Sequence, residues 1–166
     1  MKLHLGCGND YKEGYVNVDL YPQPDYKIDE VWDIRSIPQP DNSVDEILSS
    51  HVIEHFDFKT GQAVLSEWYR VLKPNGILKL ETPDLLSNCQ EFVTADDQRR
   101  IYLYNNFFSN ADLKPGQAHL FLYTEQQLCG FLYHLKFKTI NRVQPWSQYS
   151  VDPKNKHLFL AIEAQK

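Results

Sequence analysis

The sequence predicts an α/β fold with a mostly parallel sheet, helices on both faces and an antiparallel C-terminal edge strand. Short apolar or alternating runs recur along the chain, and a long amphipathic segment over residues 58–72 separates two of them. Strands separated by helix or loop crossovers pair in parallel, whereas the last two runs are joined by residues 144–156 and can pair antiparallel. The expected strands are residues 2–5, 15–20, 28–34, 44–48, 77–80, 137–143 and 157–164.

The expected helices have recognisable ends. Residues 58–72 carry apolar side chains near helical spacing and stop before the sequence PNG, which is a strong turn signal. Residues 124–133 begin at Thr124 with Gln127 three positions later, which is the pattern of a capping box. In the middle of the chain, residues 96–108 are also expected to be helical.

Composition and charge restrict the class of protein. The 166 residues, of which 42% are hydrophobic, fit one globular domain over residues 1–166 with a cap-like insertion at about 84–123. The formal net charge is −5, so the chain has no overall positive field to attract a phosphate backbone. General nucleic-acid binding is therefore disfavoured. Three separated cysteines without a C-x-x-C pair indicate a reduced, cytoplasmic protein. We see no signal peptide and no apolar run of about 20 residues, so no membrane partner is expected.

A junction near the N-terminus places two glycines where a ligand can approach the backbone. Gly6, Cys7, Gly8 and Asn9 follow the first expected strand. Glycines let the chain turn sharply there, as in the first turn of a Rossmann-like fold. The dinucleotide fingerprint has a third glycine where this chain has Tyr11, so the motif alone indicates only a tight turn.

Acidic residues end the next two expected strands. Asp19, followed by Leu20, ends the second, where a carboxylate accepts hydrogen bonds from ribose hydroxyls. Asp33 ends the third and can accept from an exocyclic amine, while Ile34 can pack on a purine face. The order of glycines and acids therefore favours a ribose-binding role for Asp19.

Polar residues also follow the fourth expected strand. Ser49, Ser50 and His51 come first, and Glu54 and His55 lie close behind. Ligands of open α/β sheets bind outside the carboxyl ends of the strands. These side chains are therefore candidates for the functional site.

Six motifs in this order resemble the class I S-adenosylmethionine-dependent methyltransferases, and more narrowly the methyltransferase type 11 group. They are LHLGCGN, VNVDL, DIRSIPQPDNSVDEI, SSHVIEHF, EWYRVLKPNGILKLETPD and, further on, LYTEQQLCGFL; the first five cover most of residues 3–84. The resemblance implies an enzyme that transfers a methyl group from its cofactor, S-adenosyl-L-methionine, to a small or medium acceptor such as a saccharide or metabolite.

The resemblance also implies which residues hold the cofactor. Gly6 and Gly8 would approach its methionine part, and Asp19 would bind the ribose hydroxyls. Asp33 and Ile34 would contact the adenine, and the residues after the fourth strand would lie near the sulfonium methyl. The full expected set is Gly6, Cys7, Gly8, Asn9, Asp19, Leu20, Asp33, Ile34, Ser49, Ser50 and His51.

The acceptor atom stays open, since oxygen, nitrogen and carbon nucleophiles all fit the sequence. A hydroxyl acceptor would benefit from a nearby base. His51 is the first candidate, because neutral imidazole is available near pH 7. Glu54 and His119 are weaker candidates.

The chain departs from the family pattern at three places. His4 stands where many members have an acid, so the methionine amino group needs another acceptor. Residues 8–15 are too short for the usual first helix, so a loop is expected, and nothing precedes the first strand. The cofactor site is therefore expected to be open or closed by a second subunit, which makes a homodimer plausible.

A zinc site is one alternative for the same residues. His51-x-x-Glu54-His55 has the spacing of the inverted zincin pattern, with two histidines four positions apart on one helix face. Zinc would need a third protein ligand, Glu67 or Glu81. Because the methyltransferase pattern explains these residues together with their flanks, no metal is expected.

Two further alternatives differ in function class. An NAD-binding reductase is disfavoured by the missing third glycine and the short chain. A non-catalytic binding module with the methyltransferase fold stays open, and cofactor binding without turnover would identify it.

Overall fold

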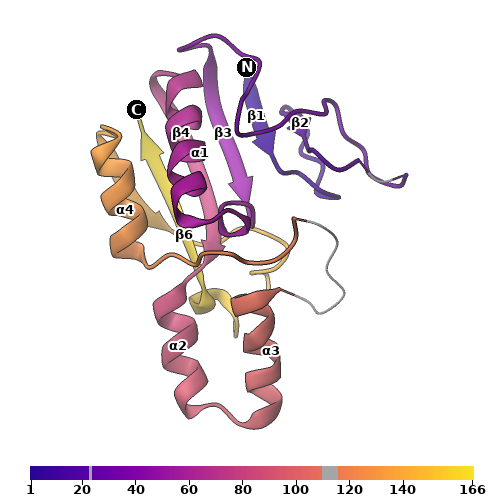
Figure 1. Cartoon of the computed structure of the whole chain (residues 1–166), viewed down its shortest axis with the longest axis vertical. Helices are drawn as coiled ribbons and strands as arrows, with labels where there is room; N and C mark the ends of the chain where they lie inside the picture. Colours follow the sequence, from indigo (N-terminus) through magenta and orange to yellow (C-terminus); the bar gives the residue numbers. More distant parts are fainter. Residues whose placement is uncertain (23, 110–115) are drawn as a thin grey trace.

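The computed structural model describes residues 1–22, 24–109 and 116–166, which form a single mixed sheet covered by helices (Figure 1). The strand order is β2-β1-β3-β4-β6-β5, and the first four pair in parallel while β6 is antiparallel to both neighbours. This confirms the α/β fold with its antiparallel C-terminal strand. The strands are β1 (Lys2–Leu5), β2 (Val16–Val18), β3 (Val44–Ser50), β4 (Leu72–Pro83), β5 (Thr139–Val143) and β6 (Phe159–Gln165).

The helices begin where side chains satisfy their first backbone N–H groups. Asp57 caps α1 by accepting from the N–H groups of Lys59 and Thr60. Thr124 and Gln127 form the predicted capping box of α4. The helices are α1 (Phe58–Val71), α2 (Leu85–Thr94), α3 (Asp97–Phe108) and α4 (Glu125–His134), with short 3-10 turns η1 (Ile53–His55) and η2 (Lys156–Leu158).

The strand expected over residues 28–34 is reduced to one isolated bridge between Val18 and Glu30. In this segment, hydrogen bonds to side chains take the place of the backbone hydrogen bonds that a strand would make with β2. The Asp29 carboxylate accepts from both the backbone N–H and the side-chain amide of Asn17. The segment is thus fixed beside β2 without forming a strand.

Strand β4 starts five residues earlier than expected. The predicted turn is present, but it lies inside β4 as an irregularity in the pairing with β3. Asn75 has a positive φ of 66°, and its N–H donates to the carbonyl of Lys166. The turn is therefore absorbed into the sheet instead of preceding it.

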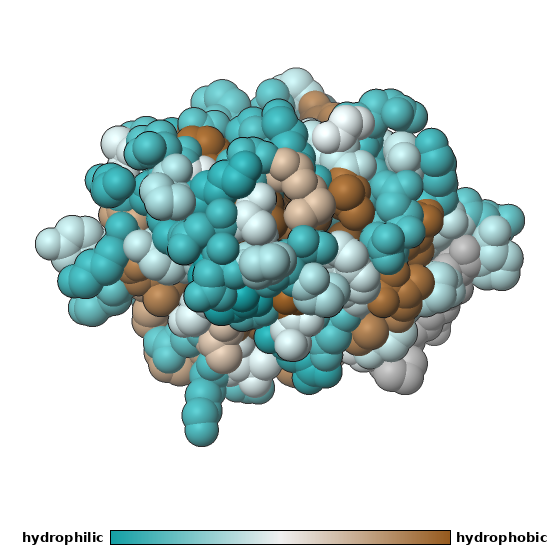
Figure 2. Space-filling model, turned by 90° about the horizontal axis from the view of Figure 1, so that it is seen from above, coloured by the Kyte–Doolittle hydropathy of each residue, from teal (hydrophilic) through white to brown (hydrophobic). Residues whose placement is uncertain are grey.

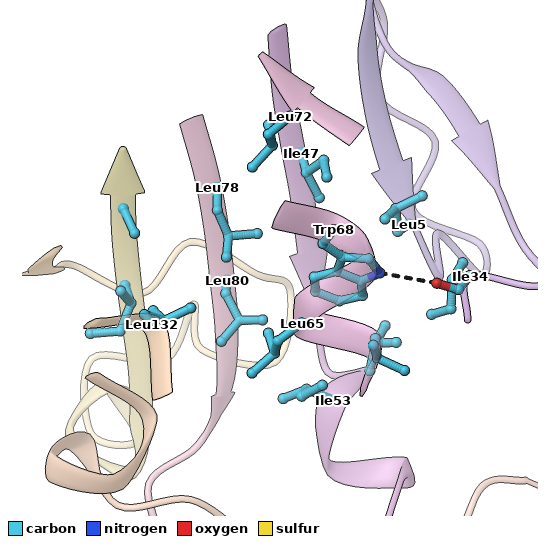
Figure 3. Close-up of a cluster of buried hydrophobic side chains, with 14 of the residues drawn as sticks. Leu5, Ile34, Ile47, Ile53, Leu65, Trp68, Leu72, Leu78, Leu80 and Leu132 are labelled. Carbon is cyan, nitrogen blue, oxygen red and sulfur yellow. Dashed lines mark hydrogen bonds between the residues drawn. The ribbon is translucent and has the colours of Figure 1, made fainter. Parts of the chain in front are cut away.

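The main core lies between the sheet and two helices, α1 and α4. Trp68 of α1 is fully buried, and its Nε1–H donates to the Ile34 carbonyl at 3.2 Å (Figure 3). Leu65 of α1 and Leu132 of α4 share the same hydrophobic cluster as the strand residues. Trp68 thereby fixes the loop that carries Asp33 and Ile34.

The opposite face of the sheet is polar. Glu46 of β3 forms ion pairs there with Lys2 at 3.2 Å and Lys79 at 3.0 Å. No helix occurs between β1 and β3 in the described residues, so the loop expected in place of the first helix is confirmed. Helices α1 and α4 contribute to the core cluster together with the strands.

The two ends of the sheet also differ. Seen from above, the end where β1 and β3 begin is mostly hydrophilic, with hydrophobic residues in small groups (Figure 2). At the other end, α2 and α3 project beyond the strands (Figure 1) around a small cluster of Leu103, Leu158 and Phe159. Helix α2 was not expected, and part of the predicted cap-like insertion lies outside the described residues. No helix of the described chain has the length and apolarity to cross a membrane.

Candidate active site

A cleft of about 730 Å³ lies at the carboxyl ends of the parallel strands. Five segments line it: the glycine loop after β1, the loops after β2 and β3, the stretch before α4, and residues 147–149 between β5 and β6. This is where open α/β sheets bind their ligands.

The glycine loop has a conformation that needs glycine. Gly6 and Gly8 have φ values of +69° and +51°. A Cβ at Gly6 would lie 2.3 Å from Cγ2 of Val52, whereas a Cβ at Gly8 would meet no protein atom within 4 Å. The N–H groups of Gly6 and Cys7 both donate to the Val18 carbonyl, which holds the loop against β2. Gly8 therefore offers open backbone to the cleft.

Asp19 lies in the cleft and is fixed by two backbone bonds. Its Oδ2 accepts from the Gly8 N–H at 2.8 Å, and its Oδ1 accepts from the Tyr21 N–H at 2.9 Å. A carboxylate has about four acceptor positions, so Asp19 can still accept from a ligand. Leu20 and Asn9 also line the cleft.

Asp33 and Ile34 line the neighbouring wall. The Arg35 guanidinium binds both oxygens of Asp33 at 2.6–2.9 Å and lowers the pKa of that carboxyl. Ile34 is nearly buried and is held by the bond from Trp68. This wall combines an apolar side chain with a fixed anionic one.

Of the three residues expected after β3, two line the cleft and one does not. Ser50 and His51 face it. Ser49 is buried between β1 and β3, where its Oγ donates to the Leu5 carbonyl at 3.1 Å. Successive strand residues point to opposite faces, which turns Ser49 away from the site occupied by Ser50.

His51 is held between two buried carboxylates. Its φ is +55°, and its N–H donates to the Glu81 carbonyl at 2.9 Å. Nδ1 lies 3.2 Å from Oε1 of Glu54, and Nε2 lies 3.5 Å from Oε1 of Glu81. Burial lowers the pKa of His51, but the two carboxylates outweigh it and raise the pKa to about 9. Imidazolium is thus the main form at pH 7, in contrast to the neutral ring expected from the sequence.

Glu81 organises the opposite side of the cleft. It is 1% exposed and accepts from the N–H groups of Trp146 at 2.6 Å and Ser147 at 3.0 Å, and from the Ser147 hydroxyl. These bonds bring residues 147–149 to the cleft, where Gln148 donates to Asn9 at 3.2 Å. The sequence analysis missed this role of Glu81 and the lining residues Ser147, Gln148 and Tyr149. Glu81 lies near the carboxyl end of β4, so the criterion applied to the other strands would have found it.

Glu54, His55 and His119 form a second polar group beside His51. Glu54 is fully buried, and its Oε2 accepts from the Thr82 hydroxyl at 3.0 Å. Burial raises the pKa of Glu54, but contacts with His51 and the nearby histidines lower it to about 2. His55 lines the cleft, and its ring centre lies 5.0 Å from that of His119.

The inverted zincin arrangement is not formed. His51 precedes η1 and has a positive φ, so it does not share a helix face with His55. Of the suggested third ligands, Glu67 binds Arg70 and the Ile37 N–H, and Glu81 faces His51.

His4, which the sequence resemblance marks as a departure from the usual acid, lines the cleft. It is 1% exposed, and its Nδ1 lies 3.1 Å from Oδ1 of Asn17. That oxygen also accepts from the Lys12 N–H, so Nδ1 must donate and Nε2 keeps its lone pair. Burial lowers the pKa of His4, which favours the neutral ring. Burial likewise raises the pKa of Cys7 to about 12, so its thiol is no nucleophile.

The cleft fits a nucleoside with a polar extension. Gly8 leaves space at the backbone, and Ser50 has a buried hydroxyl without a hydrogen-bond partner in the described part of the chain. Asp19 offers acceptor positions, and Ile34 offers an apolar surface. These features match the parts of S-adenosylmethionine.

Solved structures share this fold. An S-adenosylmethionine-dependent methyltransferase from Archaeoglobus fulgidus has a TM-score of 0.64 at 20% identity, over 99% of this chain and 85% of that one. A second such methyltransferase, from Methanosarcina mazei, has a TM-score of 0.66 at 20% identity, and the match covers 99% of this chain and 91% of that one. The 1,6-didemethyltoxoflavin-N1-methyltransferase of Burkholderia thailandensis, solved with 1,6-didemethyltoxoflavin and S-adenosylhomocysteine, has a TM-score of 0.62 at 16% identity, over 99% and 70%. At identities of 16–20%, these structural similarities show that the fold is shared.

A family model matches the N-terminal part of the chain. Residues 3–80, which hold the glycine loop, Asp19 and His51, match a family model described as a methyltransferase domain. None of the curated proteins matches the chain. Because the matched model is described as a methyltransferase domain, it does not favour the alternative of a non-catalytic binding module with this fold. Together, the match over residues 3–80 and the shared fold support a class I S-adenosylmethionine-dependent methyltransferase with S-adenosylmethionine as its cofactor.

Proposed function

We propose that this enzyme methylates a small or medium acceptor held between residues 147–149 and the stretch before α4. The observation that carries the proposal is that these two segments line the same cleft as the glycine loop, Asp19 and His51. A small acceptor is also supported by the Burkholderia thailandensis relative, which was solved with 1,6-didemethyltoxoflavin.

We assign the cofactor to the glycine-loop side of the cleft. Gly6 and Gly8 would lie against its methionine part, Asp19 would bind the ribose hydroxyls, and Asp33 with Ile34 would hold the adenine. The Nε2 lone pair of His4 would accept from the methionine amino group in place of the usual acid. When bound, the cofactor supplies a methyl group that its sulfonium has already activated. The chain's task is then to position the acceptor in line with it.

For a hydroxyl acceptor, we assign proton removal to His51, oriented by Glu54. Nδ1 faces Glu54 and Nε2 faces Glu81, so a neutral ring would keep its proton at one nitrogen and could take the acceptor's proton at the other. A pKa of about 9 makes this ring a strong base once neutral, although imidazolium dominates at pH 7. His51→Ala should therefore lower turnover more than cofactor affinity, measured as S-adenosylhomocysteine release in an acceptor screen. Glu54 and His119 support the site as positioning residues.

The environment we propose is the cytoplasm, because the cysteines Cys7, Cys89 and Cys129 are all free. A homodimer stays a prediction. Residues 147–149 of the same chain already supply one wall of the cleft.

The decisive experiment is calorimetric titration with S-adenosylmethionine and, separately, S-adenosylhomocysteine. Micromolar binding is expected, weakened at least about tenfold in Asp19→Ala, since a hydrogen bond to a charged group contributes about 1.5–3 kcal/mol. Asp25→Ala is the matched control, because Asp25 is exposed and outside the cleft. Folded protein that binds neither compound would contradict the cofactor assignment, and equal affinities of the two variants would contradict the role of Asp19.

A further inference from the structure

Three potential metal ligands meet beside the cleft from segments far apart in the sequence. Glu54 and His55 belong to η1, and His119 lies more than sixty residues later, before α4. Each offers one ligand atom, and these atoms lie within 4.8 Å of one another. In the described residues this is the one group of histidine, cysteine and acidic side chains so arranged.

Both histidines are held in the form that binds metals. Nδ1 of His55 lies 3.2 Å from the Ala118 carbonyl, and Nδ1 of His119 lies 2.8 Å from the Asn106 carbonyl. A carbonyl only accepts, so each Nδ1 carries the proton and each Nε2 keeps its lone pair. Metal-binding histidines characteristically donate their other N–H to a carbonyl or carboxylate in this way.

Glu54 supplies an oxygen that the fold leaves available. Its side chain is 0% exposed, and Thr82 holds Oε2. Oε1 has no partner with hydrogen-bond geometry in the described chain; its contact with His51 is an ion pair at 3.2 Å. If Glu54 binds a cation, Glu81 remains as the counter-charge of His51.

Backbone bonds fix the two segments together. The N–H groups of Leu120 and Phe121 donate to the Glu54 carbonyl at 2.8 and 3.2 Å. His119 is thus held next to Glu54 and His55 by the residues that follow it. The ligands are in place before any ion binds.

We propose that Glu54, His55 and His119 bind one divalent transition-metal ion of the zinc type. Two imidazoles and one carboxylate suit Zn²⁺, whereas Mg²⁺ and Ca²⁺ prefer oxygen ligands. Three protein ligands leave a coordination position open, and His55 places that position at the cleft. A hydroxyl or carboxylate oxygen of the acceptor would fill it; this last step rests on the proposed function. The metal would then orient the acceptor and acidify a bound hydroxyl.

The test measures metal binding by the full chain, without cofactor or acceptor. Zn²⁺ is titrated against a chromophoric chelator, and Co²⁺ is followed by its visible absorption. We expect one Zn²⁺ per chain. His119→Gln should weaken it at least about 100-fold, since loss of a second-shell partner alone costs about 10–100-fold.

His134→Gln is the matched control, because His134 is exposed at the end of α4. This variant should bind Zn²⁺ as the natural chain does. Circular dichroism should show that the natural chain, His119→Gln and His134→Gln are all folded. His55→Gln gives a second ligand variant. No Zn²⁺ binding by the natural chain, or equal binding by His119→Gln and His134→Gln, would overturn the site.

A separate measurement tests the open coordination position of the proposed metal site. Azide added to the Co²⁺ protein should change the visible spectrum if a coordination position faces the cleft. An unchanged spectrum would overturn the acceptor part of the proposal. Because titration with S-adenosylhomocysteine needs no metal, its failure would count against the proposed function and leave the Zn²⁺ result to stand separately.

Discussion

The two sides of the cleft are built in different ways. The side of the glycine loop consists of short stretches that each follow one strand, such as Gly6–Gly8 after β1 and Asp19 after β2, and backbone bonds hold them. The other side joins η1, β4 and residues 147–149 through buried charges around His51, and backbone bonds from Leu120 and Phe121 to the Glu54 carbonyl add the stretch before α4. Local sequence therefore fixes the first side, and long-range contacts fix the second.

The largest expected effect concerns the charged side of the cleft, which is the side around His51, Glu54 and Glu81. His51→Ala should lower the free energy of unfolding by about 3–5 kcal/mol, because it leaves Glu54 and Glu81 buried without their shared cation. Urea unfolding at pH 7 measures the change. His134→Ala, at an exposed site, should change it by less than about 0.5 kcal/mol.

A double variant sharpens this result. Adding Glu54→Gln to His51→Ala removes one of the uncompensated charges and should recover part of the lost stability. Equal stability of the single and double variants would mean that the carboxylates do not depend on His51.

The next effect concerns the glycine side, where two neighbouring glycines differ in their surroundings. Gly6→Ala should cost about 2–4 kcal/mol, because the added Cβ meets Val52 at 2.3 Å and the φ is positive. Gly8→Ala should cost about 1–2 kcal/mol, because only the backbone strain remains. Unfolding in urea compares the two.

Cofactor titration of the same variants reverses the comparison. Gly8→Ala should weaken binding although it costs less stability than Gly6→Ala, since its methyl group would enter the cleft. A Gly8 variant that binds S-adenosylmethionine normally would show that the cofactor does not approach this backbone.

The same contrast explains what the sequence could predict. The motifs LHLGCGN and VNVDL each lie within one strand and its following loop, so Gly6, Gly8 and Asp19 were placed in the cleft from local pattern alone. Ser49 was misplaced because a one-residue step along β3 turns a side chain to the other face. The strand expected at residues 28–34 failed because Asp29 satisfies Asn17 with its side chain.

The charged side could not be predicted in this way. Glu81 contacts Ser147, 66 residues away, and His119 reaches η1 through a backbone pairing that no periodicity reveals. The raised pKa of His51 depends on two carboxylates that only the fold brings to it. Such contacts depend on topology, and the sequence shows only that the residue types are present.

The smallest effect concerns His4 of β1, which lines the cleft and contacts Asn17 of β2. His4→Phe keeps an aromatic ring but removes the Nε2 lone pair that we assign to the methionine amino group. The affinity for S-adenosylmethionine should fall about tenfold, the loss expected for one hydrogen bond to a charged partner. Calorimetric titration measures it.

The control for His4 is a ligand rather than a variant. 5′-Methylthioadenosine has the adenosine part but no amino acid, so His4→Phe should leave its affinity within about threefold of the natural chain's. Because a displaced glycine loop would weaken both ligands, a selective loss for S-adenosylmethionine isolates the amino group as the partner of His4. An equal loss for both would instead make His4 a support for Asn17, to which its Nδ1 donates, and the amino group would need a different acceptor, such as Asp10 at the same end of the cleft.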